Sequence, residues 1–413
     1  MLGEEGKATS GFTVRSFLVG LCLVILVVLG APYTEYIVHT SLTTVDYFPL
    51  AAVFPFLLVV ILNVGVMRVN PRWALTTHEL CIVFIMALVT SALATAGLAS
   101  YLLATIAAPY YFTTPENRWA DYLHRHIPTW IVPRDERNAV TYFFEGLPKG
   151  TSLPWREWAI PLFWWATLII AFYGCAICLV VMLRKQWVEH ERIIFPLAEV
   201  PMEMIQRSPG GGCLPALLRK RIFWAGFLIP FLILSWNVFT WFSPVVPRIA
   251  IPQRSSSISV ARDFPGITTW LNFSVLGLAF LANLEISGSL WFFHLLSIIQ
   301  AGIYNRVGFA GGPGETYIDG HPAIAWQGFG GMVVMVFWGL WMARRHLKDV
   351  VRKAFGKAPE VDDSGEFFSY RKAVLGLFLG TIYIIVWLYR SGLSPLAILM
   401  FLFCAFVLYL GVA

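Results

Sequence analysis

Long apolar runs separated by short polar segments dominate the chain. The runs fall at about 14–31, 48–67, 76–108, 158–183, 223–242, 270–303, 324–343, 373–389 and 395–412. Most hold roughly 18–30 residues, enough for a helix to cross a bilayer, and none alternates like a membrane β-strand. Because lipid offers the backbone no hydrogen-bond partner, such spans must be helical. The pattern predicts an all-α polytopic membrane protein with about 8–10 transmembrane or re-entrant helices.

Polar segments divide the chain into three parts. We expect N-terminal transmembrane helices in 1–111, an ordered extracytoplasmic insertion with short helices at 112–157, and further transmembrane helices in 158–413. Lys and Arg gather at 184–222 and 344–372. Because cytoplasmic loops carry an excess of these residues, we expect both loops and the N-terminus to be cytoplasmic in a plasma (inner) membrane.

This orientation constrains the segment 270–323. The basic residues place residue 267 outside and Arg344 inside, and the run 324–343 accounts for one crossing. The segment must then cross an even number of times, although it holds one long apolar run followed by the glycine-rich GFAGGPGETYIDGHP. The simplest solutions are a discontinuous helix that turns near Asn283–Gly288, or a re-entrant hairpin. Transporters build substrate sites at such interruptions.

The same segment carries the candidate substrate- or ion-binding residues Asn283, Glu285, Ser287, His294 and Glu315. Ionisable groups within apolar runs are costly and usually functional. On a continuous helix Asn283, Ser287 and His294 share one stripe and Glu285 lies nearly opposite. Two interpretations stay open for Glu285, a protonatable group in a cavity or a carboxyl that holds the broken helix together. Glu315 belongs either to a gate or to a connecting turn.

Other motifs favour structural roles. Thr76 and Glu79 have the spacing of a capping box at the start of the third run. His190 and Glu191 have no second His at the spacing of a zinc protease, and no Lys-Ser or Lys-Thr follows the glycines to make a P-loop. We expect no metal site, no cofactor and no enzymatic activity.

Composition narrows the classes of function. Hydrophobic residues make up 58% of the 413 positions and charged residues 13%, with a mean hydropathy of +0.69. Soluble domains carry about twice that charge. The net charge of +6 resides in loops, which is typical of a topology signal and not of a nucleic-acid surface. Tryptophans in and after the insertion are typical of an interfacial belt: Trp119, Trp130, Trp155 and Trp158.

Four stretches resemble a known superfamily. They are TVRSFLVGL near the N-terminus, NPRWALTTHELCIVFIM at 70–86, LRKQWVEHERIIFPLAEVPMEMI at 183–205 and FGGMVVMVFWGLWMARRHL at 329–347. These patterns resemble the oligopeptide transporter superfamily, and look closer still to related prokaryotic membrane proteins of unknown function. Arg72 departs from the family pattern, where a glycine follows the Asn-Pro pair. The resemblance implies a transporter-like fold of about half the family's span number, similar to an N-terminal half.

Two functions therefore stay open. The first is an ion-coupled secondary transporter for peptides or other small polar solutes, since no nucleotide-binding motif is visible. The second is a non-transporting structural or assembly subunit of a larger complex. The sequence stops at Leu-Gly-Val-Ala inside an apolar run. Besides lipid and a small-molecule substrate, we expect a further transmembrane protein to pack on 373–412: a second half, another copy or another subunit.

Overall fold

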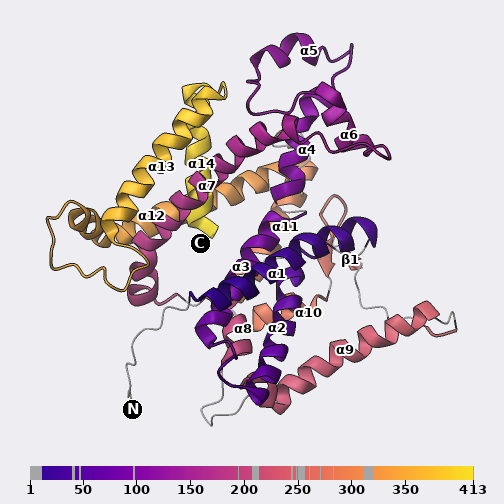
Figure 1. Cartoon of the computed structure of the whole chain (residues 1–413), viewed down its shortest axis with the longest axis vertical. Coiled ribbons are helices and arrows are strands. Elements are labelled where there is room, and N and C mark those ends of the chain that lie inside the picture. The colour runs from indigo at the N-terminus through magenta and orange to yellow at the C-terminus, as the bar shows by residue number, and fades with distance from the viewer. Residues whose placement is uncertain are drawn as a thin grey trace. The chain divides into compact units, whose positions relative to one another are not determined.

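The chain folds into helices arranged in two compact units (Figure 1), as seen in a computed structural model. It describes residues 12–39, 42–45, 48–95, 98–193, 195–206, 214–242, 245–247, 249, 256–259, 261–269, 271–281, 283–309, 312 and 320–412. Unit 1 comprises Met1–Leu102 and Phe195–Phe309, and unit 2 comprises Leu103–Ile194 and Ala310–Ala413. Within the described ranges, nine helices are long and apolar enough to cross a membrane, which confirms the predicted all-α polytopic class.

Unit 1 holds the first transmembrane helices and the middle of the chain. Its helices are α1 (Val14–Pro32), α2 (Leu50–Val69), α3 (Thr77–Leu93), α8 (Pro196–Ile205), α9 (Arg221–Phe242), α10 (Phe273–Leu281) and α11 (Leu284–Val307). A small antiparallel pair of strands, β1 (Ser256–Ile258) and β2 (Ile267–Thr269), places Ser257 opposite Thr268. The boundary with unit 2 falls inside α4 (Leu98–Tyr111).

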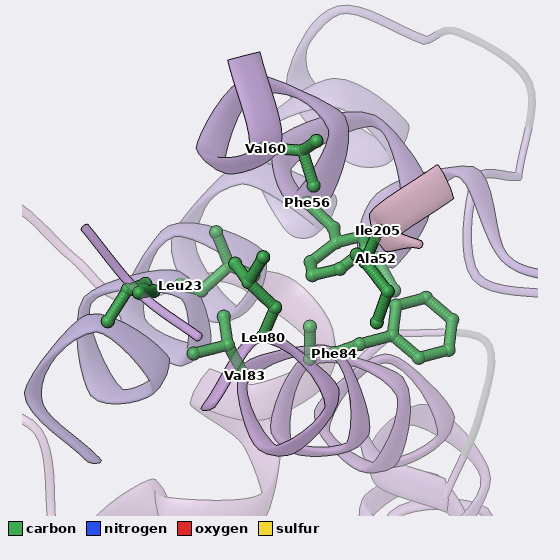
Figure 2. Packing of buried hydrophobic residues seen from close by; sticks show 10 residues of the cluster. Leu23, Ala52, Phe56, Val60, Leu80, Val83, Phe84 and Ile205 are labelled. Atoms are coloured by element: carbon green, nitrogen blue, oxygen red, sulfur yellow. The ribbon is translucent and has the colours of Figure 1, made fainter. Parts of the chain in front are cut away.

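The core of unit 1 lies where α1, α2, α3 and α8 meet (Figure 2). Buried residues of α2 and α3 recur every three or four positions, so each helix presents one apolar stripe to its neighbours. Phe56 of α2 and Phe84 of α3 meet with ring centroids 4.9 Å apart, and Ile205 of α8 covers the same cluster. A Cβ on Gly20 of α1 would overlap Met86 of α3, so these two helices pack at short distance.

Three interruptions break the long apolar runs of unit 1. The end of α1 widens into a π-helical turn at Tyr33–Ile37. The third run, expected as one continuous helix, divides into α3 and α4 around Ala94 and Thr95. The run 270–303 divides into α10 and α11 at Asn283, whose extended backbone (ψ 137°) starts the second piece. This last interruption confirms the predicted discontinuous helix.

Unit 2 contains the insertion and the remaining long helices. The insertion folds into the short helices α5 (Trp119–Tyr122) and α6 (Ala139–Glu145) with 3-10 turns at His124–His126 and Glu136–Asn138. It leads into α7 (Trp155–Lys185), which continues as a π-helical turn at Gln186–His190. The later helices are α12 (Pro322–Ala354), α13 (Tyr370–Arg390) and α14 (Pro395–Val412).

The helices α7 and α13 form the centre of unit 2 (Figure 1). Gly376 and Gly380 of α13 face the buried thiols of Cys178 and Cys175, and a Cβ on them would lie 2.9 and 2.6 Å from the Sγ atoms. Small residues at such positions let helices pack closely inside a membrane. Arg184, at the end of α7, donates two hydrogen bonds of 2.7 and 2.9 Å to the buried carboxylate of Glu366.

The insertion packs on these helices through aromatic contacts. The ring of Trp130 meets that of Trp387 edge-on at 5.0 Å, and the indole N–H of Trp165 donates to the carbonyl of Ile131. Trp158 is buried against Phe143. Of the tryptophans expected to form a belt, Trp158 is therefore a buried core residue, and Trp130 packs against the core while partly buried. Each of the two units is assembled from two separate stretches of chain. The domain boundaries expected at 111 and 157 stay predictions.

The glycine face of α13 yields a stability prediction. Gly380→Ala adds a methyl group against the Cys175 thiol, so we expect it to lower the free energy of unfolding by about 1–3 kcal/mol. The double variant with Cys175→Ala removes the opposing sulfur and restores stability. Gly339→Ala in α12 is the matched control, because a Cβ there meets nothing within 4 Å. Melting temperatures of the purified protein decide the matter, and equal values for both single variants would contradict the packing argument.

A second prediction concerns orientation. Seven of the nine candidate spans begin before Lys353, so seven complete crossings would put it opposite the N-terminus. The basic residues around Lys353 instead predict that it lies on the same side as the N-terminus. One of the seven crossings must then be incomplete. In a cysteine-free background we expect Lys353→Cys to react with an impermeant thiol reagent from the cytoplasmic side and Arg134→Cys from the other. Labelling of both from one side would remove the argument for an incomplete crossing.

Candidate functional site

Two buried carboxylates lie near the opposite ends of α1, which is about the length of the hydrocarbon core of a bilayer. Glu79 contacts the N-terminal end of this helix, and Glu35 lies in the π-helical turn that ends it. Glu79 is only 1% exposed and Glu35 only 5% exposed. An ionised group withdrawn from water is costly unless donors or an opposite charge meet it. The two sites differ in how far that condition is met.

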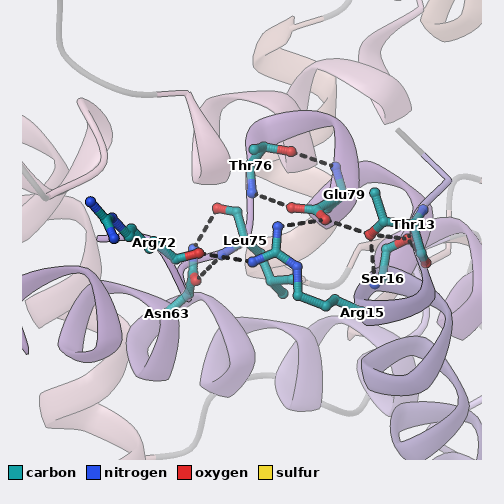
Figure 3. Close-up of polar contacts among 8 residues, drawn as sticks. All are labelled: Thr13, Arg15, Ser16, Asn63, Arg72, Leu75, Thr76 and Glu79. Carbon is teal, nitrogen blue, oxygen red and sulfur yellow. Dashed lines mark hydrogen bonds and ion pairs between the residues drawn. The ribbon is translucent and has the colours of Figure 1, made fainter. Parts of the chain in front are cut away.

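Glu79 is held on both of its oxygens (Figure 3). Oε2 accepts from the backbone N–H of Thr76 at 2.8 Å, while the Thr76 hydroxyl accepts from the N–H of Glu79, which is the predicted capping box. Oε1 accepts from the hydroxyl of Thr13, the N-cap residue of α1. The Arg15 guanidinium lies 3.3 Å from the same oxygen. Glu79 therefore joins the first turns of α1 and α3.

The loop before α3 is fixed by the same network (Figure 3). The buried Asn63 of α2 donates to the carbonyl of Leu75 at 3.1 Å and accepts from its N–H at 2.7 Å. Arg15 donates to the carbonyl of Arg72 at 3.0 Å. All partners are protein groups and the carboxylate has its counter-charge. This junction between α1, α2 and α3 is structural.

Glu35 has a different environment, built from hydroxyl groups. Its Oε1 accepts from the backbone N–H of Thr43 at 2.7 Å, from the Thr43 hydroxyl at 2.9 Å and from the Thr44 hydroxyl at 3.2 Å. The Thr44 and Thr95 hydroxyls lie 2.6 Å apart. Either hydroxyl can be the donor in this contact. Three hydroxyl oxygens from two segments thus lie around one carboxylate, and each keeps a lone pair.

Irregular backbone makes this arrangement possible. The π-helical turn offsets Glu35 from the regular α1 register, and such turns are frequent at functional sites. Thr95 has a φ of +38°, an unfavourable value for a β-branched residue, at the interruption between α3 and α4. Tyr36 of the same turn is hydrogen-bonded to Ser100 of α4 at 2.6 Å. The site therefore gathers where two long helices are broken.

The second carboxylate oxygen of Glu35 differs from the first in its hydrogen bonding. Oε2 is buried and, among the described residues, has no hydrogen-bond partner. No Lys, Arg or His among those residues forms a salt bridge with Glu35. A hydrogen-bond donor, a proton or a small cation would stabilise a buried carboxylate oxygen in this state, and the hydroxyl oxygens nearby are hard ligands for such a cation. The arrangement is a candidate cation site.

Three of the five predicted binding residues, Glu285, Ser287 and His294, lie in α11 of unit 1. Asn283 precedes the first residue of α11, and its side chain makes no capping hydrogen bond. Glu285 and His294 are exposed and Ser287 is half-buried, while the Ser289 hydroxyl donates to the backbone carbonyl of Glu285. The described contacts do not bring these side chains together. Their role in binding stays a prediction, and Glu315 lies outside the described residues.

Only weak signals along the chain indicate the Glu35 site. Glu35, Thr43 and Thr44 belong to the polar segment YTEYIVHTSLTTVDY, which resembles an ordinary linker between two apolar runs. Thr95 belongs to SALATAGLAS, an alanine-rich stretch of small residues inside the third run, in which only Gly97 strongly disfavours a helix. The usable signal is the coincidence of a threonine-rich linker with a small-residue interruption. Which threonines meet the carboxylate depends on how the helices pack.

The nine candidate spans found among the described residues, with a buried polar site between interrupted helices, define a polytopic α-helical membrane protein. The chain belongs to a family of unknown function, DUF6785, whose model matches residues 6–413. No curated protein matches the chain. No solved structure matches it either.

The Glu79 junction predicts unequal effects for its two partners. Glu79→Ala removes the cap of α3 and the acceptor of Thr13, so we expect a loss of about 2–4 kcal/mol in the free energy of unfolding. Arg15→Gln should cost less than about 1 kcal/mol, because the Arg15 side chain is 48% exposed and its ion pair is screened. Denaturation of the two purified variants tests this order, and a larger loss for Arg15→Gln would refute it.

Proposed function

We propose that this chain is a cation-coupled secondary transporter in which Glu35 binds the coupling ion. The observation that carries the proposal is the buried Oε2 of Glu35, without a partner among the described residues, beside three threonine hydroxyls at a break in two transmembrane helices. Discontinuous helices hold coupling ions in many transporters. Either a proton on Oε2 or a sodium ion between the carboxylate and hydroxyl oxygens would neutralise the buried charge of Glu35.

The substrate class follows from the resemblance to oligopeptide transporters. We propose peptides or other small polar solutes as cargo, and the interruption between α10 and α11 as the region that receives them. The chain would lie in the plasma (inner) membrane with its N-terminus in the cytoplasm, as the basic loops indicate. A cation bound at Glu35 would change the charge and packing at the ends of α1 and α3. Such a change can couple ion binding to movement of these helices.

Cation-dependent stability of the purified protein tests the coupling site without a known substrate. A ligand at a hundredfold its Kd stabilises a protein by about 2.7 kcal/mol, which raises the melting temperature by a few degrees. We expect sodium chloride, compared with N-methylglucamine chloride at equal ionic strength, or a lower pH to produce this rise in the wild type. Glu35→Gln removes the response because the amide neither holds a cation nor binds a proton in this range.

The matched control is Glu79→Gln. It alters an equally buried carboxylate at the other end of α1, whose oxygens already have protein partners. We expect this variant to melt at a lower temperature but to keep the full response to sodium or to pH. Sodium and pH are separate arms of the test, so the response also names the ion. An unchanged response in Glu35→Gln, or no response in the wild type, would rule out the site.

Transport itself is tested in proteoliposomes. We expect a sodium or proton gradient to drive uptake of radiolabelled di- and tripeptides by the wild type, and expect Glu35→Gln to lose gradient-driven uptake. If the wild type responds to cation in the stability assay but no small solute is transported, the cation site stands. The transporter function then fails, which favours the structural-subunit alternative.

A further inference from the structure

The insertion and the start of α7 enclose a crevice that the proposed transport function does not use. Two polar cavities of about 300 and 500 Å³ lie here and share Arg137, Arg156 and Glu157 as lining residues. Arg134 also lines the smaller one. All of these residues belong to unit 2. Three guanidinium groups and the two carboxylates of Glu136 and Glu157 line these cavities, which leaves one net positive charge. Glu136 lies at the exposed rim, 3.9 Å from Arg134, and Glu157 is the buried carboxylate.

Glu157 is the central group of this crevice. Its side chain is only 9% exposed, and its Oε1 lies 3.7 Å from Nε of Arg137. Its Oε2 is buried and has no hydrogen-bond partner among the described residues. Leaving such an oxygen without a donor is costly. The crevice therefore lacks a donor, ideally a cationic one, that would complete the carboxylate.

The loop on one side of the crevice is held rigidly. Asp135 accepts hydrogen bonds from the N–H groups of Val140 and Thr141 and from the Thr141 hydroxyl, at 2.8–3.0 Å. These bonds fix the chain on either side of Arg137 and Asn138, whose φ angles of 58° and 54° are both left-handed. Consecutive left-handed non-glycine residues persist only where the surroundings enforce them, and they cluster at ligand sites.

An apolar cavity adjoins the polar part. It has a volume of about 170 Å³ and shares Tyr142, Leu153, Pro154 and Trp155 with the larger polar cavity. Phe143, Trp158 and Leu162 also line it. The helix α7 begins at Trp155 and belongs to a candidate span, so its first turn lies at the level of lipid headgroups. A charged half and an apolar half thus meet at the membrane boundary.

We propose that this crevice binds a phospholipid whose headgroup joins a phosphate to a primary ammonium, the phosphatidylethanolamine class. The phosphate accepts from the guanidinium groups of Arg134 and Arg156, the ammonium donates to Glu157 Oε2, and part of an acyl chain fills the apolar cavity. The anionic headgroup of phosphatidylglycerol offers Glu157 neutral hydroxyl donors but no cationic one, so it forms the weaker hydrogen bond. A choline headgroup carries no N–H and cannot supply one.

Lipid binding to the full-length protein, delipidated in detergent and measured by native mass spectrometry, tests the proposal. We expect phosphatidylethanolamine to bind more tightly than phosphatidylcholine or phosphatidylglycerol with the same acyl chains. The difference should be roughly tenfold to a hundredfold, the size of one charge-assisted hydrogen bond. Free O-phosphoethanolamine should bind much more weakly, because it leaves the apolar cavity unfilled.

Two variants identify the residues. Glu157→Gln should lose the preference for phosphatidylethanolamine and favour phosphatidylglycerol, because it removes the negative charge and leaves the arginines. Arg156→Gln should weaken both lipids. The matched control Glu116→Gln changes an exposed carboxylate of the same insertion that lines neither polar cavity, and should behave as the wild type. Melting temperatures of all variants establish that they are folded.

Three results would overturn the proposal. One is equal binding of the ethanolamine and choline lipids by the wild type. The second is a lipid preference that survives in a folded Glu157→Gln variant. The third is free O-phosphoethanolamine binding as tightly as the lipid, which would assign the crevice to a soluble zwitterion. None of these outcomes depends on transport, so the proposed function and this site fail separately.

Discussion

The cost of burying a carboxylate organises much of this structure. A charged oxygen removed from water must meet hydrogen-bond donors or a cation, and the apolar surroundings of a membrane helix make that demand strict. The buried carboxylates of Glu79 and Glu366 are both neutralised by an arginine, and each connects separate segments of the chain. Glu35 and Glu157 have one satisfied oxygen and one that lacks a partner among the described residues. Carboxylates whose oxygens all have partners hold the helices in place. Carboxylates with an oxygen that lacks a partner mark the places where a bound ligand would add most stability.

The helices themselves could be predicted well from the sequence, because the information is local. Length and apolarity decide whether a run can span a bilayer, and the nine candidate spans in the described part of the chain follow the nine apolar runs. The capping box at Thr76 and Glu79 was equally predictable, since both partners lie within one turn. The break at Asn283 followed from a count of crossings against the basic loops. The break at Thr95 did not, because alanine, threonine and glycine are all compatible with a membrane helix.

The candidate site could not be predicted, because its parts are distant in sequence. Glu35 lies eight residues from Thr43 but sixty from Thr95, and no periodicity connects a linker to the middle of a later helix. The residues that sequence reasoning favoured, such as Glu285, stood out because they interrupt an apolar run. Glu35 did not stand out, because it lies among polar neighbours that would be unremarkable in water. Its burial arises from packing, and packing depends on side chains from several helices at once.

The two units are interleaved along the chain, and this affects how the protein is made. The helix α7 leaves the ribosome long before its main partner α13, and the whole of 195–309 belongs to the other unit. During this interval the cysteine face of α7 and the guanidinium of Arg184 have neither Gly376 and Gly380 nor Glu366 to meet them. The newly inserted helix must therefore wait in the bilayer, shielded by lipid or by the insertion machinery. Chains released early would expose the same face to quality-control proteases.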